Sequence, residues 1–458
     1  MKKKQLLLAF TSILSIGALT ACGGNTSADV EITVYNWEDY IYDGTDDDGE
    51  KVDDSIIESF EKKYLEDTGK TIKVNYKTFS TCEEMYTKIK QGIVKADLCC
   101  PSDYMIQKMQ GEGLLEPFGY DETNKKYTTG LDNVNAYTSP YIKKLFDKND
   151  LSNYAVPYFW GTMGYTYNPE VVSEEQVSTW EFQWNPGTEL KKKITIKDSV
   201  RDTYFTAVMH VYKEELDSLK NQYKAGTITA EAYNNSLSEI FNRHDDETLR
   251  KAEEALKDLK DNVILEVDEG KNDMVLGNIH VNLAWSGDSV FSMDEAESDE
   301  KYLAYSVPEE GSNVWFDGWC MPKGANVEAS KAFLDYLALP EVAALNMDYT
   351  GYTSPIAGQA IWDLCNEWYS LDAYANEDGT NDYTIEDCDE VDLSYFFEGT
   401  LDDGVEAKIL IPTEERGRQF DAQYPSLDVI TRCAIMKDFG EEGNAKLYTM
   451  WSNFKASF

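Results

Sequence analysis

The chain has 458 residues, which is too long for one small core and suits two domains. Its residues are 42% hydrophobic and 28% charged, with a mean hydropathy of −0.50, a composition typical of a soluble globular protein. The formal net charge of −42 argues against binding to nucleic acid or to anionic lipid. It favours cationic partners, although acidic charge can also serve solubility alone.

The N-terminus carries a predicted export signal. Lys2, Lys3 and Lys4 precede an apolar run over residues 6–21, shorter than the roughly 20 residues that a membrane-spanning helix needs. The run ends in Leu19-Thr20-Ala21-Cys22-Gly23, which matches the bacterial lipobox. We therefore predict that residues 1–21 are a signal peptide and that Cys22 carries a lipid. Residues 22–30 then form a linker to a mature protein anchored outside the cell membrane.

Metal and catalytic signatures are not found in the sequence. Seven cysteines remain besides Cys22, at positions 82, 99, 100, 320, 365, 388 and 433. They form no C-x-x-C pair, and the three histidines (His210, His244 and His280) are far apart, so we predict no metal site and no cofactor. Their disulfide connectivity stays open. Neither a G-x-S-x-G nor an H-E-x-x-H motif is present, so we expect no hydrolase of those types.

The first part of the chain predicts alternating strands and helices. Alternating apolar residues indicate strands at 31–37, 72–76 and 96–100. A helix with an apolar face ends at Gly69, and a capping box at Ser80 to Glu83 begins the next helix. This order predicts a parallel sheet whose ligands bind at the carboxyl ends of the strands.

The remainder predicts a second lobe. We expect a first crossing between lobes near Gly161 and a second near Trp315. Charged helices are expected over 210–262, with Thr229 and Asp246 as N-caps. A strand at 282–287 that leaves into a loop and a strand at Leu393–Phe397 are also expected. Two further helices are expected around 415–423 and 441–455. Segments 211–245 and 366–406 have no further interpretation than surface elaboration.

The stretch that ends the first strand has a chemical signature. Trp37 and Tyr40 flank the carboxylates Glu38 and Asp39. Aromatic faces beside carboxylates suit an organic ammonium ion, because the ring quadrupole and the negative charge both attract it. The alternative is a pair of core aromatics beside an acidic turn.

Seven short motifs occur in an order that resembles one family. They are Tyr35-Asn36-Trp37-x-x-Tyr40, Pro101-Ser102-x-Tyr104, Val156-Pro157-Tyr158-x-Trp160-Gly161, Asp198-Ser199-Val200-Arg201-Asp202, Trp285-x-Gly287, Trp315-x-Asp317 and Gly351-Tyr352-x-x-Pro355. The chain resembles the spermidine/putrescine-binding proteins of ABC importers, a branch of the periplasmic binding protein superfamily.

The resemblance implies an α/β, two-lobed periplasmic-binding-protein-like fold of type II. Each lobe is then a mostly parallel sheet flanked by helices, with a hinge between lobes. We expect residues 31–160 plus 316–351 in lobe 1 and residues 161–315 plus 352–458 in lobe 2.

The resemblance also implies the site residues. Its aromatic box corresponds to Trp37, Tyr40, Tyr104, Trp285, Trp315 and Tyr352. Asp317 corresponds to a carboxylate that pairs with one amine, Asp202 to the acid at the other end of the ligand, and Ser102 to a hydroxyl contact. The family's remaining acid aligns with either Asp198 or Ser199, and Glu38 stands where a polar contact is expected. Met436 departs from the pattern, because the family has a glutamine there.

The function implied is capture of a polyamine, putrescine or spermidine, by a lipid-anchored binding protein that is not an enzyme. Its expected partners are an ABC permease and its ATPase, with the Cys22 lipid as the contact with the membrane. No nucleic acid is expected, and the protein is expected to be a monomer. The alternatives are a binding protein for another small cationic or polar solute, a surface sensor, and an exported glycosidase, since aromatics and paired carboxylates also suit sugars.

Overall fold

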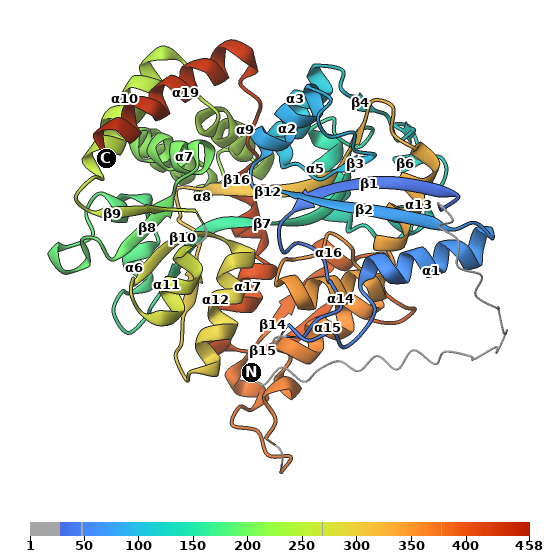
Figure 1. The fold of residues 1–458 in the computed structure, drawn as a ribbon. Helices are drawn as coiled ribbons and strands as arrows, with labels where there is room; N and C mark the ends of the chain where they lie inside the picture. Colours follow the sequence, from blue (N-terminus) through green and yellow to red (C-terminus); the bar gives the residue numbers. More distant parts are fainter. Residues whose placement is uncertain (1–27, 47–48, 268, 377) are drawn as a thin grey trace.

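The computed structural model describes residues 28–46, 49–267, 269–376 and 378–458. The predicted signal peptide and the lipobox Cys22 lie outside the described residues. Helices and strands form two lobes side by side, joined by long strands that run between them (Figure 1). The predicted two-lobed α/β fold is confirmed. In the part of the chain that the structure describes, no helix is both long and apolar enough to cross a bilayer.

The first lobe is built on a parallel sheet with strand order β2-β1-β3. Its strands are β1 (Val30–Trp37), β2 (Ile72–Phe79) and β3 (Leu98–Cys99). The helices between them are α1 (Ile56–Thr68) and α2 (Cys82–Lys90), and α3 (Asp103–Gly111) follows β3. Gly69 ends α1 in the left-handed conformation (φ 71°), as the sequence predicts. The capping box predicted at Ser80 is wrong, because the N-cap of α2 is Thr81, whose hydroxyl accepts from the amide of Glu84.

The second lobe is built on a larger, mixed sheet. Its strand order is β16-β12-β7-β10-β8-β9, and β11 also pairs with β7. The strands are β7 (Val156–Tyr167), β8 (Ile194–Lys197), β9 (Val263–Glu266), β10 (Val281–Trp285), β11 (Ala304–Ser306), β12 (Ser312–Trp319) and β16 (Cys433–Ala434). β8, β9 and β10 pair in parallel, whereas β7 pairs antiparallel with β10, β11 and β12. The expectation of a mostly parallel sheet therefore holds for the first lobe but not for this one.

The two predicted crossings lie next to each other. β7 and β12 pair antiparallel, with Trp315 opposite Gly161, and Figure 1 shows both strands passing from one lobe to the other. All of β7 is buried. Its first half, up to Trp160, packs in the core of the first lobe, and its second half, from Met163, packs in the core of the second. The crossing is thus a two-stranded ribbon with a hydrophobic core at each end.

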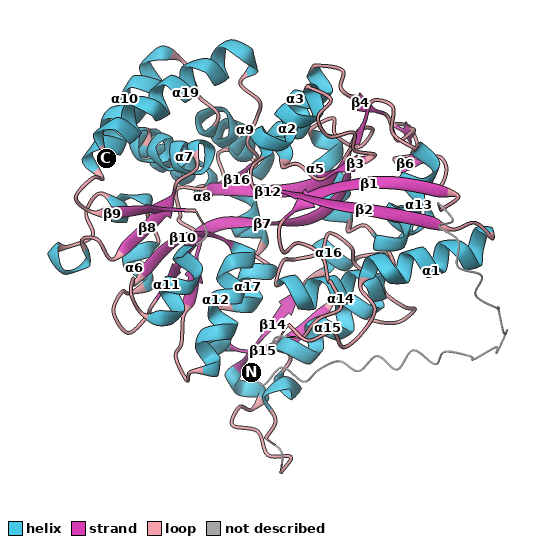
Figure 2. Ribbon diagram, in the orientation of Figure 1, coloured by secondary structure: helices cyan, strands magenta, loops and turns pink. Residues whose placement is uncertain are grey.

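Helices cover the second sheet (Figure 2). They are α7 (Val200–Val211), α8 (Lys213–Lys224), α9 (Ala230–Phe241), α10 (Asp246–Asp258), α11 (Glu269–Leu276), α12 (Ser286–Ser298) and α19 (Gly440–Ser457). Thr229 caps α9 as predicted, but α10 is capped by Asp245 rather than Asp246. The strand predicted at 282–287 ends at Trp285 and continues directly into α12 instead of a loop, because Ser286 and Gly287 begin that helix.

The C-terminal segment 352–458, which we expect in lobe 2, contributes to both hydrophobic cores. Helices α13 (Val327–Leu337), α14 (Pro340–Thr350) and α15 (Gln359–Tyr369) lead into the hairpin of β14 (Cys388–Asp392) and β15 (Lys408–Pro412). Phe396 stacks on Trp160 with ring centroids 5.6 Å apart. Gln419–Gln423 also pack on α12, and Ala434 and Met436 through α19 join the second core.

The strand predicted at Leu393–Phe397 is wrong, because residues Ser394–Phe397 form the short helix α16. Phe396 and Phe397 are both buried, and consecutive inward side chains do not fit a strand that buries one face. The helix predicted around 415–423 is shorter, α17 (Gln419–Gln423), and α19 extends the last predicted helix by one residue at its start and two at its end.

Candidate ligand-binding site

A continuous cleft of about 3870 Å³ separates the two lobes. Cavities that hold small ligands usually measure about 300–1,000 Å³, so this space exceeds what one small molecule fills. Every site residue that the resemblance implied lines it: Trp37, Glu38, Tyr40, Ser102, Tyr104, Asp198, Ser199, Asp202, Trp285, Trp315, Asp317 and Tyr352. Met436 lines it as well. These residues come from at least seven separate segments, and the fold brings them to one surface.

Asp317 is the most buried acid among these predicted residues. It lies in β12 next to the bulge where the pairing with β7 shifts, and only 5% of it is exposed. The Tyr40 hydroxyl donates to one carboxylate oxygen at 2.7 Å, and the Ser102 hydroxyl donates to the other at 2.7 Å. Burial raises the pKa of Asp317 to about 6, while these two hydrogen bonds oppose the rise and the charge of Asp202 adds to it.

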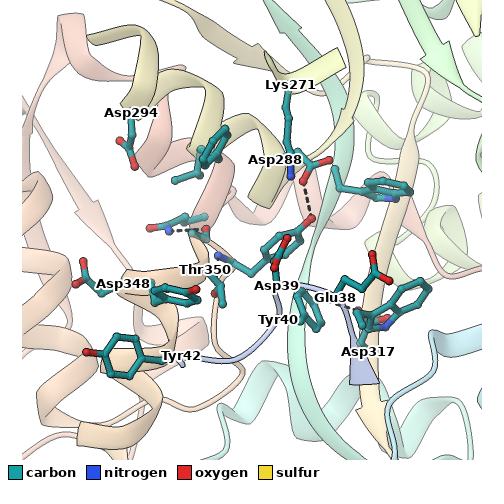
Figure 3. A pocket seen from close by; sticks show the side chains of 18 of the residues that line it. Glu38, Asp39, Tyr40, Tyr42, Lys271, Asp288, Asp294, Asp317, Asp348 and Thr350 are labelled. Atoms are coloured by element: carbon teal, nitrogen blue, oxygen red, sulfur yellow. Dashed lines mark hydrogen bonds between the residues drawn. The ribbon is translucent and has the colours of Figure 1, made fainter. Parts of the chain in front are cut away.

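Aromatic rings surround this carboxylate. The Tyr40 ring meets Tyr352 edge to face with centroids 5.1 Å apart, and Tyr352 meets Trp315 at 5.7 Å. Asp39 has a left-handed backbone (φ 49°), so the chain turns after β1 and buries Tyr40 while Glu38 stays exposed. Figure 3 shows Tyr40, Asp288 and Asp317 around the same part of the cleft.

The second lobe supplies another buried acid. Asp202 lies in the first turn of α7 and is 9% exposed. Burial raises its pKa, whereas hydrogen bonds from Ser199 and Trp285 and the charge of Lys197 lower it. Asp202 of α7 and Asp317 of β12 both line the cleft.

Asp198 and Ser199, the two alternatives for the family's remaining acid, have different neighbours. The Asp198 carboxylate forms an ion pair with Lys455 of α19, and its side chain is partly exposed. Ser199 lies at the start of α7, three residues before Asp202, and lines the cleft as Asp198 does.

Three predicted residues lie toward the first-lobe rim. Trp37 packs on Phe79 with centroids 4.6 Å apart, and its buried indole nitrogen has no hydrogen-bond partner among the described residues. Glu38 accepts a weak hydrogen bond from Ser80 at 3.5 Å. Tyr104 donates to Glu83 at 3.1 Å.

The Tyr104 ring also faces a cation from the other lobe. The guanidinium of Arg201 lies 5.1 Å from the ring centroid of Tyr104 and 4.0 Å from that of Phe439. Arg201 belongs to the Asp198–Asp202 motif, but the sequence analysis assigned it no role. Its position in the cleft wall could have been inferred from its place directly before Asp202.

The sequence analysis also missed Asp288 and Lys197. The Tyr352 hydroxyl donates to Asp288 at 2.8 Å, drawn as a dashed line in Figure 3, and Asp288 lies 3.6 Å from the ammonium of Lys197. Lys197 ends the apolar strand Ile194-Thr195-Ile196-Lys197, and a lysine in such a run was the available signal.

Met436 stands where the family has a glutamine, but another glutamine side chain lies close to it. The Met436 side chain is buried, and its carbonyl accepts from the side-chain amide of Gln107 at 3.0 Å. An amide is therefore present near this position, although it comes from α3 of the first lobe.

The described cysteines are all free thiols. Within the described ranges, no group of three or more His, Cys, Asp or Glu side chains is arranged to hold a metal ion.

Comparisons with known proteins agree with this geometry. The family model of the bacterial extracellular solute-binding proteins matches residues 55–363. The spermidine/putrescine-binding periplasmic protein of Salmonella typhimurium is 27% identical over 360 residues, which cover 78% of this chain and 85% of the relative. The putrescine-binding periplasmic protein PotF of Escherichia coli is 27% identical over 356 residues, covering 74% and 82%.

A solved structure is also similar. The spermidine/putrescine ABC transporter substrate-binding protein PotD from Streptococcus pneumoniae, in complex with calcium and HEPES, matches with a TM-score of 0.58 and 25% identity. The match covers 93% of this chain and 99% of that chain. Since the family model spans more than half of the sequence, this chain belongs to the bacterial extracellular solute-binding protein family.

Proposed function

We propose that this chain captures a polyamine of the putrescine and spermidine class between its two lobes and delivers it to an ABC importer. The observation that carries the proposal is Asp317, a buried carboxylate inside an aromatic wall, in a cleft that a second buried acid, Asp202, also lines. A diamine has one ammonium for each acid and methylene groups between them.

The chemistry favours a cation over a neutral ligand. An ionised carboxylate is costly to bury unless an opposite charge pairs with it. The hydroxyls of Tyr40 and Ser102 occupy one position on each oxygen of Asp317 and leave room for an ammonium donor. Desolvated contacts between ammonium and aromatic rings contribute about 2 kcal/mol each. A few of these and two charge-assisted pairs suffice for about −8 kcal/mol, a micromolar affinity.

The relatives support the choice of ligand and transport system. Those named above are spermidine/putrescine-binding or putrescine-binding proteins, and the similar solved structure is named as part of an ABC transporter. By this proposal the site comprises the cleft residues around Asp317 and Asp202. The protein then acts as a monomer without enzymatic activity, and its partner is the permease with its ATPase.

The proposal includes a lipid anchor on Cys22. Replacing Cys22 with Ala should leave the signal peptide attached and the lipid absent, because the thioether forms on that sulfur. Mass spectrometry of the membrane-extracted protein measures both. Diacylglycerol still attached to the Cys22→Ala chain would contradict the assignment.

Calorimetric titration tests the ligand class. Putrescine, cadaverine, spermidine and spermine are compared with 1,4-butanediol, which has the length of putrescine without its charges, and with glucose. We expect a polyamine to bind with micromolar affinity and the two neutral ligands to give no binding heat. Equal binding of butanediol and putrescine, or binding of glucose alone, would refute the proposed function.

A further inference from the structure

A buried lysine lies behind the second-lobe wall of the cleft. Lys197 is 1% exposed, and its ammonium lies 2.9 Å from the carboxylate of Glu266 and 3.6 Å from that of Asp288. It also donates to the carbonyl of Val267 at 3.1 Å and lies 4.4 Å from the centre of the Trp285 ring.

These neighbours are the partners that a ligand ammonium would use. A carboxylate pair and the face of a tryptophan are a typical ammonium site. Glu266 is 7% exposed and Asp288 is 6% exposed, so both charges require a cation close by. The chain supplies that cation itself, because Lys197 pairs with both carboxylates behind the cleft wall.

The charge of Lys197 reaches the ligand space. Trp285 lines the cleft and Lys197 lies over its ring, and Asp288, which pairs with Lys197, lines the cleft as well. Lys197 also acts electrostatically on Asp202. Lys271 lines the cleft too, but it is half-buried with its ammonium 5.3 Å from the Phe291 ring, where water screens its charge more strongly.

We propose that Lys197 is a specificity-determining residue that limits the site to ligands with two ammonium groups. The proposal rests on the proposed function. A diamine places its ammonium groups at Asp317 and Asp202. A third ammonium that extends toward Trp285 and Asp288 would meet a carboxylate that already has Lys197 as its partner. The protein therefore prefers putrescine and cadaverine over spermidine.

The test compares the binding of putrescine and spermidine to the full-length chain in detergent and to its Lys197→Met variant by calorimetry. Methionine keeps most of the side-chain volume and removes the charge. We expect the spermidine-to-putrescine affinity ratio to rise about tenfold or more, because removing a positive charge benefits a trication more than a dication. Lys143→Met is the control, since Lys143 is a partly buried lysine of α5 (Pro140–Lys148) that does not line the cleft. Its ratio should equal that of the parent.

A second pair of variants covers the case in which Lys197→Met does not fold. The double variant Lys197→Met/Asp288→Asn removes one charge of each sign and should return the ratio toward the parental value. Asp288→Asn alone adds one net positive charge and should lower the ratio. The role of Lys197 would be overturned if the parent binds polyamines and the spermidine-to-putrescine affinity ratio is the same in all three variants. That result would leave the proposed function intact. A parent that binds no polyamine would refute the proposed function itself.

Discussion

At the scale of single residues, Asp317 is held ready for a cation. Burial opposes its ionised form, and the hydroxyls of Tyr40 and Ser102 favour it. Both hydroxyls belong to the first lobe, so this half of the site is assembled before any ligand arrives. An ammonium that pairs with Asp317 therefore meets a carboxylate whose orientation is already set.

Replacing Asp317 with Asn should weaken putrescine binding by about 2–5 kcal/mol, because it removes the charge from a desolvated pair. Trp315→Ala should cost less, since Tyr40 and Tyr352 remain as walls. Calorimetry measures both affinities. The matched control is Asp39→Asn, which removes an exposed acid of the same cleft and should change affinity little. Parental affinity in Asp317→Asn would exclude Asp317 from the site.

The raised pKa of Asp317 predicts a pH dependence of binding. Burial raises this pKa from 3.8 to about 6 in the free protein, and a bound ammonium favours the ionised form. Ligand binding should therefore release a proton below about pH 6, and affinity should fall as the pH decreases through that value. The raised pKa of Asp202 acts in the same direction.

Proton release is measured by titrating putrescine at pH 5 to 6 in buffers that differ in ionisation enthalpy. The heat of binding should vary with the buffer in the parent and vary less in Asp317→Asn. Heats that are independent of the buffer in the parent would show that no carboxyl changes its protonation on binding.

At the scale of elements, the sequence predicted helices and strands correctly where a local pattern of residues was enough to determine them. The strands β1 and β2, the helix α1 and its Gly69 cap follow from alternation, amphipathic spacing and a residue suited to a left-handed backbone. The N-caps of α2 and α10 were each misplaced by one residue, because neighbouring Ser and Thr, or neighbouring Asp residues, offer equivalent oxygens. Only the backbone turn decides which of them caps.

Long-range contacts could not be predicted from these patterns. The position of α16 depends on the packing of Phe396 against Trp160, more than 200 residues away in sequence. Trp37, Glu38 and Tyr40 had a chemical signature of their own, and the other predicted cleft residues came from a motif resemblance rather than from periodicity. Asp288 and Lys197 lie outside those matched positions, so their ion pair became visible only in the folded chain.

Gly287 in the first turn of α12 is required by the site. A methyl group there would collide with the Tyr352 ring, which packs directly on this glycine. Gly287→Ala should therefore destabilise the protein by about 1–3 kcal/mol and displace Tyr352 from Asp288, which weakens putrescine binding.

The matched control is Gly111→Ala at the end of α3, where an added methyl meets no atom within 4 Å. Urea unfolding measures the stability of both variants, and calorimetry measures their affinity. The proposed packing is wrong if Gly287→Ala and Gly111→Ala have the same stability and affinity.

At the scale of the whole molecule, two cores share one ribbon. β7 and β12 connect them, and the site residues divide between the lobes, with Tyr40 and Ser102 on the first and Asp202 and Trp285 on the second. A ligand that contacts both lobes binds the closed form better than the open form, and only this difference in affinity can shift the equilibrium. The volume of the cleft leaves room for such a closure.

Capture between the lobes is the central claim, and small-angle X-ray scattering tests it most directly. The chain lacking residues 1–27 is measured alone, with saturating putrescine, and with butanediol at the same concentration. Putrescine should reduce the radius of gyration, because closure brings Asp202 toward Asp317, and butanediol should leave it unchanged. A radius of gyration that stays the same when calorimetry shows putrescine bound would contradict capture by both lobes.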